Sequence, residues 1–302
     1  MCNPKKQDKM NKMKESMNEI ELYYFSGTGN TLFIANKLKE RILHINLKPI
    51  VPLLVNPELT PKSKIIGFCF PNHAGHLPIP MKLFIKKLRL VGDEYIFAIC
   101  NSAFSKCFAP NDINKIINKY GAKLSSYFNI LMPDNHSCSM KGFIAHKEED
   151  FLKYINQAQI DLDFISDILL KKDNYYQIDD KPAPFPKFID KVLVPFIYYL
   201  NVSHPATVLK GSLYADLKCV GCKTCEKVCL ANRITIKNNR PYFDYKKTCF
   251  GCYCCVNYCP KESIQLGSKW YNGKSYTTEN GRYSHPFASV RDIVIQKKEN
   301  NT

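Results

Sequence analysis

Eight cysteines in the last third of the chain have the spacing of metal ligands. They form two sets about thirty residues apart: Cys219, Cys222, Cys225 and Cys229, then Cys249, Cys252, Cys255 and Cys259. In each set, two-residue gaps separate the first three cysteines, and the fourth follows after a gap of three residues. Nearby residues repeat as well, because Gly221 matches Gly251 and Ile234 matches Ile264. The region therefore reads as two copies of one structural unit.

This spacing suits cubane iron–sulfur clusters, because two-residue gaps let three consecutive thiolates wrap one cluster. The fourth cysteine of each set lies too far along the chain to complete its own cluster, so it caps the other one. We expect two [4Fe-4S] clusters, one held by Cys219, Cys222, Cys225 and Cys259, the other by Cys249, Cys252, Cys255 and Cys229. The alternative is structural zinc, which prefers paired C-x-x-C hooks in a tetrahedral site.

Two residues depart from the expected pattern of the cysteine loops. Pro260 follows the last cysteine of the second copy, whereas Leu230 follows that of the first and lacks the fixed φ of proline. Cys254 lies beside Cys255, where the first copy has Thr224. We expect Cys229 to remain a ligand and Cys254 to be a bystander.

A second candidate site is the run Ser26, Gly27, Thr28, Gly29, Asn30 and Thr31. It lies between an apolar run at 20–25, expected to be a buried strand, and a helical pattern that continues through Leu38 and Ile42. Glycines let the backbone close around an anion, and N–H groups at the helix start point at it. Neither the P-loop ending nor the spaced glycines of dinucleotide folds are present. The loop resembles the FMN-phosphate loop of flavodoxins at Ser26, Thr28, Gly29 and Thr31, although another phosphate could also bind there.

The elements that must position this loop alternate along the chain. Further strands are expected at 48–54, 65–70, 95–100 and 124–132, and helices at 79–88, 111–120 and 148–171. This alternation predicts an α/β fold, a flavodoxin-like doubly wound parallel sheet of five strands. The last helix should bury one face, made of Phe151, Ile155, Ile160, Phe164 and Ile168.

In such a fold the ligand lies beyond the carboxyl ends of the strands. By resemblance to flavodoxins, the loops at 71–78 and 101–104 would hold the flavin ring. Backbone groups near Asn72 and Ser102 would bond its edge, and His73, Leu77 and Phe104 would lie against it. These loops contain no Trp or Tyr, so the contacts to the ring would differ from those of ordinary flavodoxins.

We expect five segments along the chain. Residues 1–17 would be a disordered arm, with Met17 as an alternative start, and 18–175 the flavodoxin-like domain. Residues 176–210 would be a linker with an apolar helix at 188–202, which is too short and too interrupted to span a membrane. A small α+β two-cluster ferredoxin domain would follow at 211–270. The tail at 271–302 would dock over it through Arg282, Tyr283 and His285.

Charge and compartment narrow the choice of partners. The formal net charge of +16 is lowered by thiolates on iron, and no interleaving of basic and aromatic residues marks a nucleic-acid face. A basic surface can instead steer an acidic redox partner. The amino terminus has no secretory pattern, and the clusters need a reducing compartment, so we expect a cytoplasmic protein of an anaerobic or microaerobic cell.

Taken together, the chain resembles the flavodoxin-ferredoxin fusion proteins known as EFR-family ferredoxins. The resemblance rests on the 26–31 loop, the Pro71 loop, both cysteine sets and the Gly281-Arg-Tyr-x-x-Pro286 run. It implies electron transfer with a redox protein partner, such as a ferredoxin, a flavoprotein or an oxidoreductase.

Three functions remain open at this point. The first is an electron carrier that joins two [4Fe-4S] clusters to FMN. The second is a flavin-dependent reductase that acts on a small molecule beside His73 and Phe104. The third is a redox sensor or scaffold with an empty flavodoxin-like domain. The sequence shows redox centres but no acid–base constellation, which favours the carrier.

Overall fold

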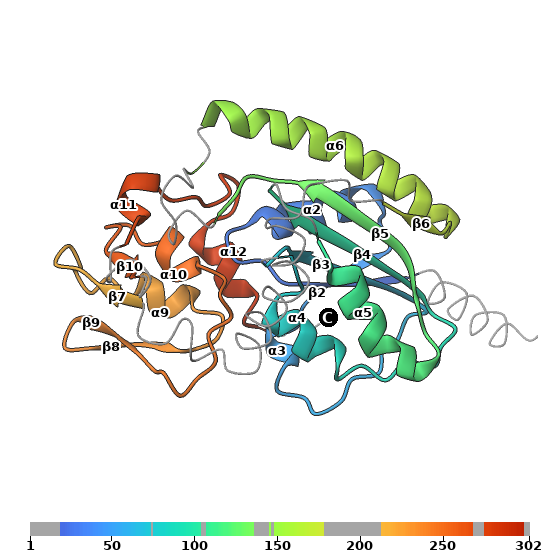
Figure 1. Ribbon diagram of the computed structural model, residues 1–302, viewed down its shortest axis with the longest axis horizontal. Coiled ribbons are helices and arrows are strands. Elements are labelled where there is room, and N and C mark those ends of the chain that lie inside the picture. Colours follow the sequence, from blue (N-terminus) through green and yellow to red (C-terminus); the bar gives the residue numbers. More distant parts are fainter. Residues whose placement is uncertain are drawn as a thin grey trace, which may run out of the picture.

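A parallel sheet of six strands forms the centre of the molecule, in the order β2-β1-β3-β4-β5-β6 (Figure 1). The computed structural model describes residues 19–73, 75–103, 107–135, 145, 148–177, 213–267 and 275–298. The strands are β1 Ile20–Tyr24, β2 Ile45–Pro49, β3 Ile65–Pro71, β4 Tyr95–Ser102, β5 Leu124–Leu131 and β6 Tyr175–Tyr176. The order of the first five is flavodoxin-like, so the predicted fold class is confirmed, and β6 adds a short edge strand that the sequence pattern did not predict.

Helices cover both faces of this sheet (Figure 1). One face carries α2 Asn30–Arg41 and α6 Glu148–Lys171. The other carries α3 Ile50–Leu53, α4 Ile79–Ile85, α5 Ala109–Ile117 and the turn η1 Asn118–Tyr120. Because side chains alternate along a strand, Phe68 and Phe70 of β3 join the core under α4, whereas Cys69 joins the core under α2.

Two expectations about these elements were wrong. The strand expected at 48–54 ends at Pro49, and α3 begins at Ile50, because Pro52 lacks the N–H that a strand ladder needs but fits the first turn of a helix. In α6, Ile160 and Phe164 are 62% and 46% exposed. The buried face instead contains Phe151 and then Ala158, Leu162, Ile165 and Leu169, which are spaced three or four residues apart.

A small cysteine-rich α+β region lies at one side of the sheet (Figure 1). Its strands are β7 Leu213–Ala215, β8 Ile234–Lys237, β9 Arg240–Phe243 and β10 Ile264–Leu266, and its helices are α9 Thr224–Val228 and α10 Cys254–Asn257. β7 pairs with β10 and β8 pairs with β9, both antiparallel. The β8–β9 turn places Asn238 and Asn239 at positive φ, as tight hairpin turns require.

The two regions share one hydrophobic core. Val228, Leu230 and Cys254 belong to the same buried cluster as Phe25 and Phe68 of the sheet region. Two short helices complete the described chain, α11 Thr277–Asn280 and α12 Val290–Ile295, and Ile293 of α12 enters the same cluster. The sheet and the cysteine-rich region therefore pack as one body in this structure.

Some expectations concern residues that the structure does not describe. The arm at 1–17, the helix at 188–202, almost all of the linker, and Phe104 lie outside the described residues. Of the helices that are described, none has the length and apolar character to cross a membrane.

Candidate functional site

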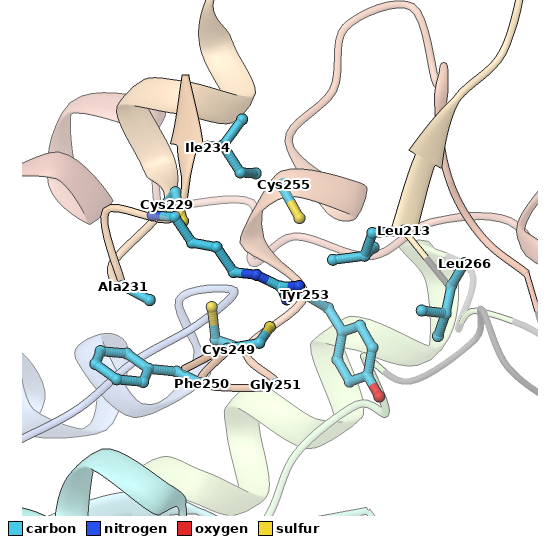
Figure 2. A pocket seen from close by; sticks show the side chains of 12 residues that line it. Leu213, Cys229, Ala231, Ile234, Cys249, Phe250, Gly251, Tyr253, Cys255 and Leu266 are labelled. Carbon is cyan, nitrogen blue, oxygen red and sulfur yellow. The ribbon is translucent and has the colours of Figure 1, made fainter. Parts of the chain in front are cut away.

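Two cavities in the cysteine-rich region are each lined by four cysteines. The first is lined by Cys219, Cys222, Cys225 and Cys259. The second, shown in Figure 2, is lined by Cys229, Cys249, Cys252 and Cys255. Each cavity takes three cysteines from one copy of the repeat and the fourth from the other copy. The fold thus groups the cysteines in the two sets that the spacing suggested, while iron binding by these sets stays a prediction.

The backbone repeats together with the sequence, which explains how the cysteines converge. Equivalent residues of the two copies take the left-handed conformation, which tightens each ligand loop. These pairs are Gly221 and Gly251, Lys223 and Tyr253, and Asn232 and Glu262. Behind each loop, a backbone N–H donates to the sulfur of the fourth cysteine: Arg233 N to Cys229 Sγ and Ser263 N to Cys259 Sγ, both at 3.3 Å.

The first cavity opens toward solvent. Cys222 is exposed, and Lys223 and Lys261 contribute to the lining. Burial raises the pKa of Cys225 to about 12. Burial also acts on Cys259, but hydrogen bonds from the Ser263 hydroxyl and nearby backbone N–H groups outweigh it and lower that pKa.

The second cavity is more apolar. Leu213, Phe250 and Leu266 surround its cysteines (Figure 2). Burial raises the pKa of Cys249 and, more strongly, that of Cys255. Burial disfavours the thiolate forms of these two residues because an isolated thiolate loses its hydration, whereas a hydrogen bond with Cys254 lowers the pKa of Cys252. Iron supplies a positive charge and deprotonates the ligands it binds.

Arg233 tests whether an iron–sulfur cluster fits the second cavity. Its side chain is 2% exposed and lines this cavity. Nε donates to the carbonyl oxygen of Asp244 at 3.1 Å, but Nη1 and Nη2 have no hydrogen-bond partner among the described residues. A buried guanidinium without a counter-charge is costly. Four thiolates around a [4Fe-4S] core carry a net negative charge, so the cavity and its arginine fit such a group.

A single metal ion fits less well. Within the described parts of the chain, no three His, Cys, Asp or Glu side chains converge closely enough to hold one ion. Zinc needs four ligand atoms at bonding distance from one point. The cysteines of each set instead line the wall of a cavity.

Cys254 lines neither of the two cavities. It is fully buried, and its thiol donates to the carbonyl oxygen of Gly27 at 3.0 Å. This contact places the second cysteine loop directly on the 26–31 loop. The expectation that Cys254 is a bystander to the ligand set agrees with this position.

The 26–31 loop has the features of a phosphate cradle. Its residues Ser26, Thr28 and Thr31 are each 1% exposed, and Gly29 is left-handed with φ 106°. Ser26 Oγ accepts the N–H groups of Gly29 and Leu32, both at 3.2 Å. In the described structure, the N–H groups of Thr28, Asn30 and Thr31 donate no hydrogen bond. Buried N–H groups at a helix start are suited to an anion, so the loop has the donors that a phosphate group needs.

The outer side of this loop is covered by the carboxyl-terminal tail. His285 N donates to Thr28 O at 2.7 Å, and the Tyr283 hydroxyl donates to Asn30 Oδ1 at 2.7 Å. Gln296 bonds both the N–H and the carbonyl oxygen of Ser26, each at 3.0 Å. The tail also contacts the cysteine-rich region, as expected, since Arg282 donates to backbone carbonyls there, and its contact with the 26–31 loop is an addition that the sequence did not predict.

The close packing of the cysteine loop and the tail gives Gly27 and Gly29 a second role that the sequence did not reveal. A Cβ at Gly27 would lie 2.4 Å from the carbonyl oxygen of Cys252, and a Cβ at Gly29 would lie 2.4 Å from Cβ of Ala288. Glycine at both positions therefore lets the cysteine loop and the tail pack closely on the loop. The Ser-Gly-Thr-Gly pattern shows the glycines but not their partners, which are more than 200 residues away.

The loops expected to hold the flavin ring are only partly described. The side-chain oxygen of Asn72 accepts Gly75 N at 2.7 Å, and the Ser102 hydroxyl donates to Asn129 Oδ1 at 2.9 Å. His73 is partly exposed, with its ring 6.4 Å from that of Phe25. Leu77 is fully buried in the core, which argues against its expected place on the ring. Ring contacts by Asn72, His73, Ser102 and Phe104 remain predictions.

The same edge of the sheet holds an acid–base pair that sequence reasoning missed. His76 Nδ1 lies 2.8 Å from Asp112 Oδ2, and the His76 ring lies 5.6 Å from that of Phe108. Asp112 stands in the first turn of α5, and His76 in the loop after β3. The two residues are 36 positions apart in the sequence, so no local motif predicted that they would pair.

Comparisons with known proteins add little to this picture. No protein-family model matches the chain, and no curated protein matches it. Among solved structures it is similar to the metal-soaked Flv1 flavodiiron core from Synechocystis sp., with 15% identity, a TM-score of 0.31, and coverage of 55% of this chain and 39% of that one. It is also similar to rubredoxin oxygen:oxidoreductase from the anaerobe Desulfovibrio gigas, with 11% identity, a TM-score of 0.31, and coverage of 55% and 40%. The chain thus spans about two fifths of those chains. Likeness at this level carries no argument, and the flavodoxin-like assignment rests on the strand order.

Proposed function

We propose that this chain is an electron-transfer protein that holds two [4Fe-4S] clusters and one FMN. The observation that carries the proposal is the pair of cavities, each lined by four cysteines drawn three from one repeat and one from the other. Crossed ligation of this kind is what two-cluster ferredoxin spacing is built for. The flavodoxin-like fold and its buried, glycine-rich loop support the flavin part of the proposal.

The arrangement in space suggests a route for electrons. The first cavity reaches the surface at Cys222, whereas the second adjoins the 26–31 loop through Cys252, whose carbonyl oxygen lies against Gly27. Clusters exchange single electrons and FMN exchanges one or two, so the bound groups would convert between one-electron and two-electron chemistry. The protein would bind the groups through its cysteines and its loop N–H groups. The apolar side chains around the second cavity would keep water away.

The partner would dock beside the first cavity. Leu217 is 97% exposed and Val220 62% exposed, on either side of Cys219. Lys218 and Lys223 flank these apolar side chains and are also exposed. An exposed apolar patch with a basic rim suits an acidic redox protein of the ferredoxin, flavoprotein or oxidoreductase class, because the opposite charges would steer the encounter. We place this exchange in a reducing compartment such as the cytoplasm, where thiolate-held clusters persist.

The direct test is anaerobic purification followed by iron, sulfide and released-flavin analysis of one sample. We expect about eight irons, about eight sulfides and one FMN per chain, and a visible spectrum that bleaches on reduction. Zinc without sulfide would contradict the cluster assignment. Full iron without flavin, even after FMN is added, would leave a cluster carrier whose flavodoxin-like domain is structural or sensory.

The His76–Asp112 pair favours a second candidate, a flavin-dependent reductase. A carboxylate that orients an imidazole is a common proton donor arrangement. If the chain is a reductase, replacing His76 with Gln should slow reduction of an acceptor that takes two electrons and protons, such as a quinone. Reduction of a one-electron protein acceptor should be unchanged. If the variant reduces both acceptors as fast as the wild type does, electron transfer would remain as the function.

A further inference from the structure

The linings of the two cavities differ at several repeat-related positions, and one of these differences places a buried charged side chain in the second cavity alone. Arg233 and Ser263 occupy equivalent places, and each donates its backbone N–H to the fourth cysteine of its copy at 3.3 Å. The Ser263 hydroxyl lies 3.3 Å from Cys259 Sγ, at the first cavity. The Arg233 side chain lines the second cavity. The repeat therefore gives both cavities the same backbone bond to sulfur, but gives the second cavity a buried cation as well.

The Arg233 side chain is held in place by contacts that include no carboxylate among the described residues. Nε is fixed by the carbonyl oxygen of Asp244, and Cζ lies 5.0 Å from the centroid of the Tyr245 ring. Among the described residues, Nη1 and Nη2 have no hydrogen-bond partner of suitable geometry, and no carboxylate ion pair includes Arg233; its charge acts on the thiol of Cys249 in the cavity. Because a buried cation needs an opposite charge, the natural partner of this guanidinium is the content of the cavity.

The physical effect of such a charge on a cluster has a definite sign. Reduction adds one negative charge to a cluster, so a nearby fixed cation stabilises the reduced form more than the oxidised form. The effect is strong where the surroundings are apolar, as beside Leu213, Phe250 and Leu266. Lys223 and Lys261 of the first cavity are exposed, so water and salt screen their charges.

We propose that Arg233 raises the reduction potential of the cluster held by Cys229, Cys249, Cys252 and Cys255 above that of the other cluster. An electron that enters at the exposed Cys222 then moves inward and rests beside the 26–31 loop. Arg233 is a positioning and tuning residue, since it acts on the electron through its charge. The inference rests on the proposed function, because it needs both clusters to be present.

The test is an anaerobic redox titration of the full chain followed by electron paramagnetic resonance. We would compare the wild type with Arg233→Ser, which copies the residue of the other repeat, with Arg233→Lys, which keeps the charge, and with the control Lys261→Ser. The wild type should show two separated one-electron steps. Arg233→Ser should lower the higher potential enough to change the reduced-to-oxidised ratio at least tenfold, which is about 59 mV for a one-electron couple. Arg233→Lys should retain most of the separation, and Lys261→Ser should shift neither step by that much.

The outcomes separate this inference from the proposed function. A wild type without iron sinks the proposed function itself. Arg233→Ser with about eight irons and unchanged potentials overturns the inference and leaves electron transfer standing. If Arg233→Ser keeps only about four irons, the Arg233→Lys variant decides between charge and packing. Full iron and a retained potential in Arg233→Lys would support the role of the charge. Loss of the same cluster in Arg233→Lys would show that Arg233 acts through packing and would overturn the inference.

Discussion

The thiol of Cys254 donates a hydrogen bond to the carbonyl oxygen of Gly27, across 3.0 Å and 227 residues of sequence. This bond joins the second cysteine loop to the loop that fits a phosphate. Gly27 also lies against the carbonyl oxygen of Cys252, with no room for a Cβ between them. The two candidate redox sites are therefore built against each other.

The crossed arrangement of ligands predicts which cysteine variants resemble each other. Cys229→Ala should lose the same cluster as Cys249→Ala, although Cys229 belongs to the first sequence set. Cys259→Ala should likewise match Cys219→Ala. Each variant should retain about four irons, and paramagnetic resonance should give one spectrum for each matched pair. If Cys229→Ala instead lost the same cluster as Cys219→Ala, the crossed assignment would be wrong.

Replacing Cys254 with Ala should weaken the contact between the regions without removing iron. The variant loses a buried sulfur and a hydrogen bond to Gly27, so we expect it to be destabilised by about 1–2 kcal/mol. Thermal unfolding measures this loss, and iron analysis provides the second readout. Cys225→Ser is the matched control, since it removes a cavity-lining cysteine and should cost a cluster. A Cys254→Ala protein with about four irons would show that Cys254 is a ligand.

Gly29 and Gly121 form a matched pair for testing the tail contact. Both have positive φ, at 106° and 73°, so Ala is strained at each and should cost about 1 kcal/mol on that account. A Cβ at Gly121 meets nothing within 4 Å, whereas at Gly29 it collides with Ala288 and His285. Gly29→Ala should therefore be less stable than Gly121→Ala by about 1–3 kcal/mol in urea unfolding. Equal losses would mean that the tail does not pack on the loop in solution.

His285 should make the stability of the protein depend on pH. It is 1% exposed and packed between the rings of Phe33 and Phe151, and burial lowers its pKa to about 4. The unfolded chain binds the proton below a pKa of about 6.5, so between these values the unfolded state is the more protonated one. The free energy of unfolding should fall as the pH drops from about 6.5 to 4, by up to about 1.4 kcal/mol per pH unit.

Thermal unfolding across this range would measure the contribution of His285. His285→Phe keeps the ring packing and removes the titrating group, so its stability should fall less steeply with acid. Parallel curves for the two proteins would assign the pH dependence to other groups.

The basic rim of the first cavity predicts a salt-dependent encounter. Exchanging Lys218 and Lys223 for Glu should slow electron transfer from an acidic ferredoxin-type donor at low ionic strength, because steering turns into repulsion. The difference from wild type should shrink at high salt, where exposed charges are screened. Stopped-flow reduction provides the rates. Lys39→Glu combined with Lys86→Glu, two exposed lysines of the sheet region, is the control for the same change in net charge, and an equal slowing by that variant would rule out docking at this face.

Local patterns were sufficient for much of the fold and for the ligand sets. Strand and helix periods follow from backbone geometry, so α6 was expected at its observed bounds, and the strand–helix alternation gave the doubly wound sheet. The cysteine spacing likewise carries its own geometry, since a three-residue step along a tight loop turns successive thiols toward one point. The sequence of α6 could not show which of its apolar residues are buried, because burial depends on the other elements that pack against the helix. Phe164 is the example, half exposed beside Tyr175.

Contacts between distant segments were decided by the tertiary structure. The tail docks on the 26–31 loop through Tyr283, His285 and Gln296, whose partners lie about 250 to 270 residues away. The sequence has Arg233 where the other repeat has Ser263, but the identity of a residue does not show whether its guanidinium forms an ion pair with a carboxylate. Only the folded chain shows that this charge is buried beside four cysteines without a carboxylate partner among the described residues, because burial and pairing are properties of the surroundings that folding creates.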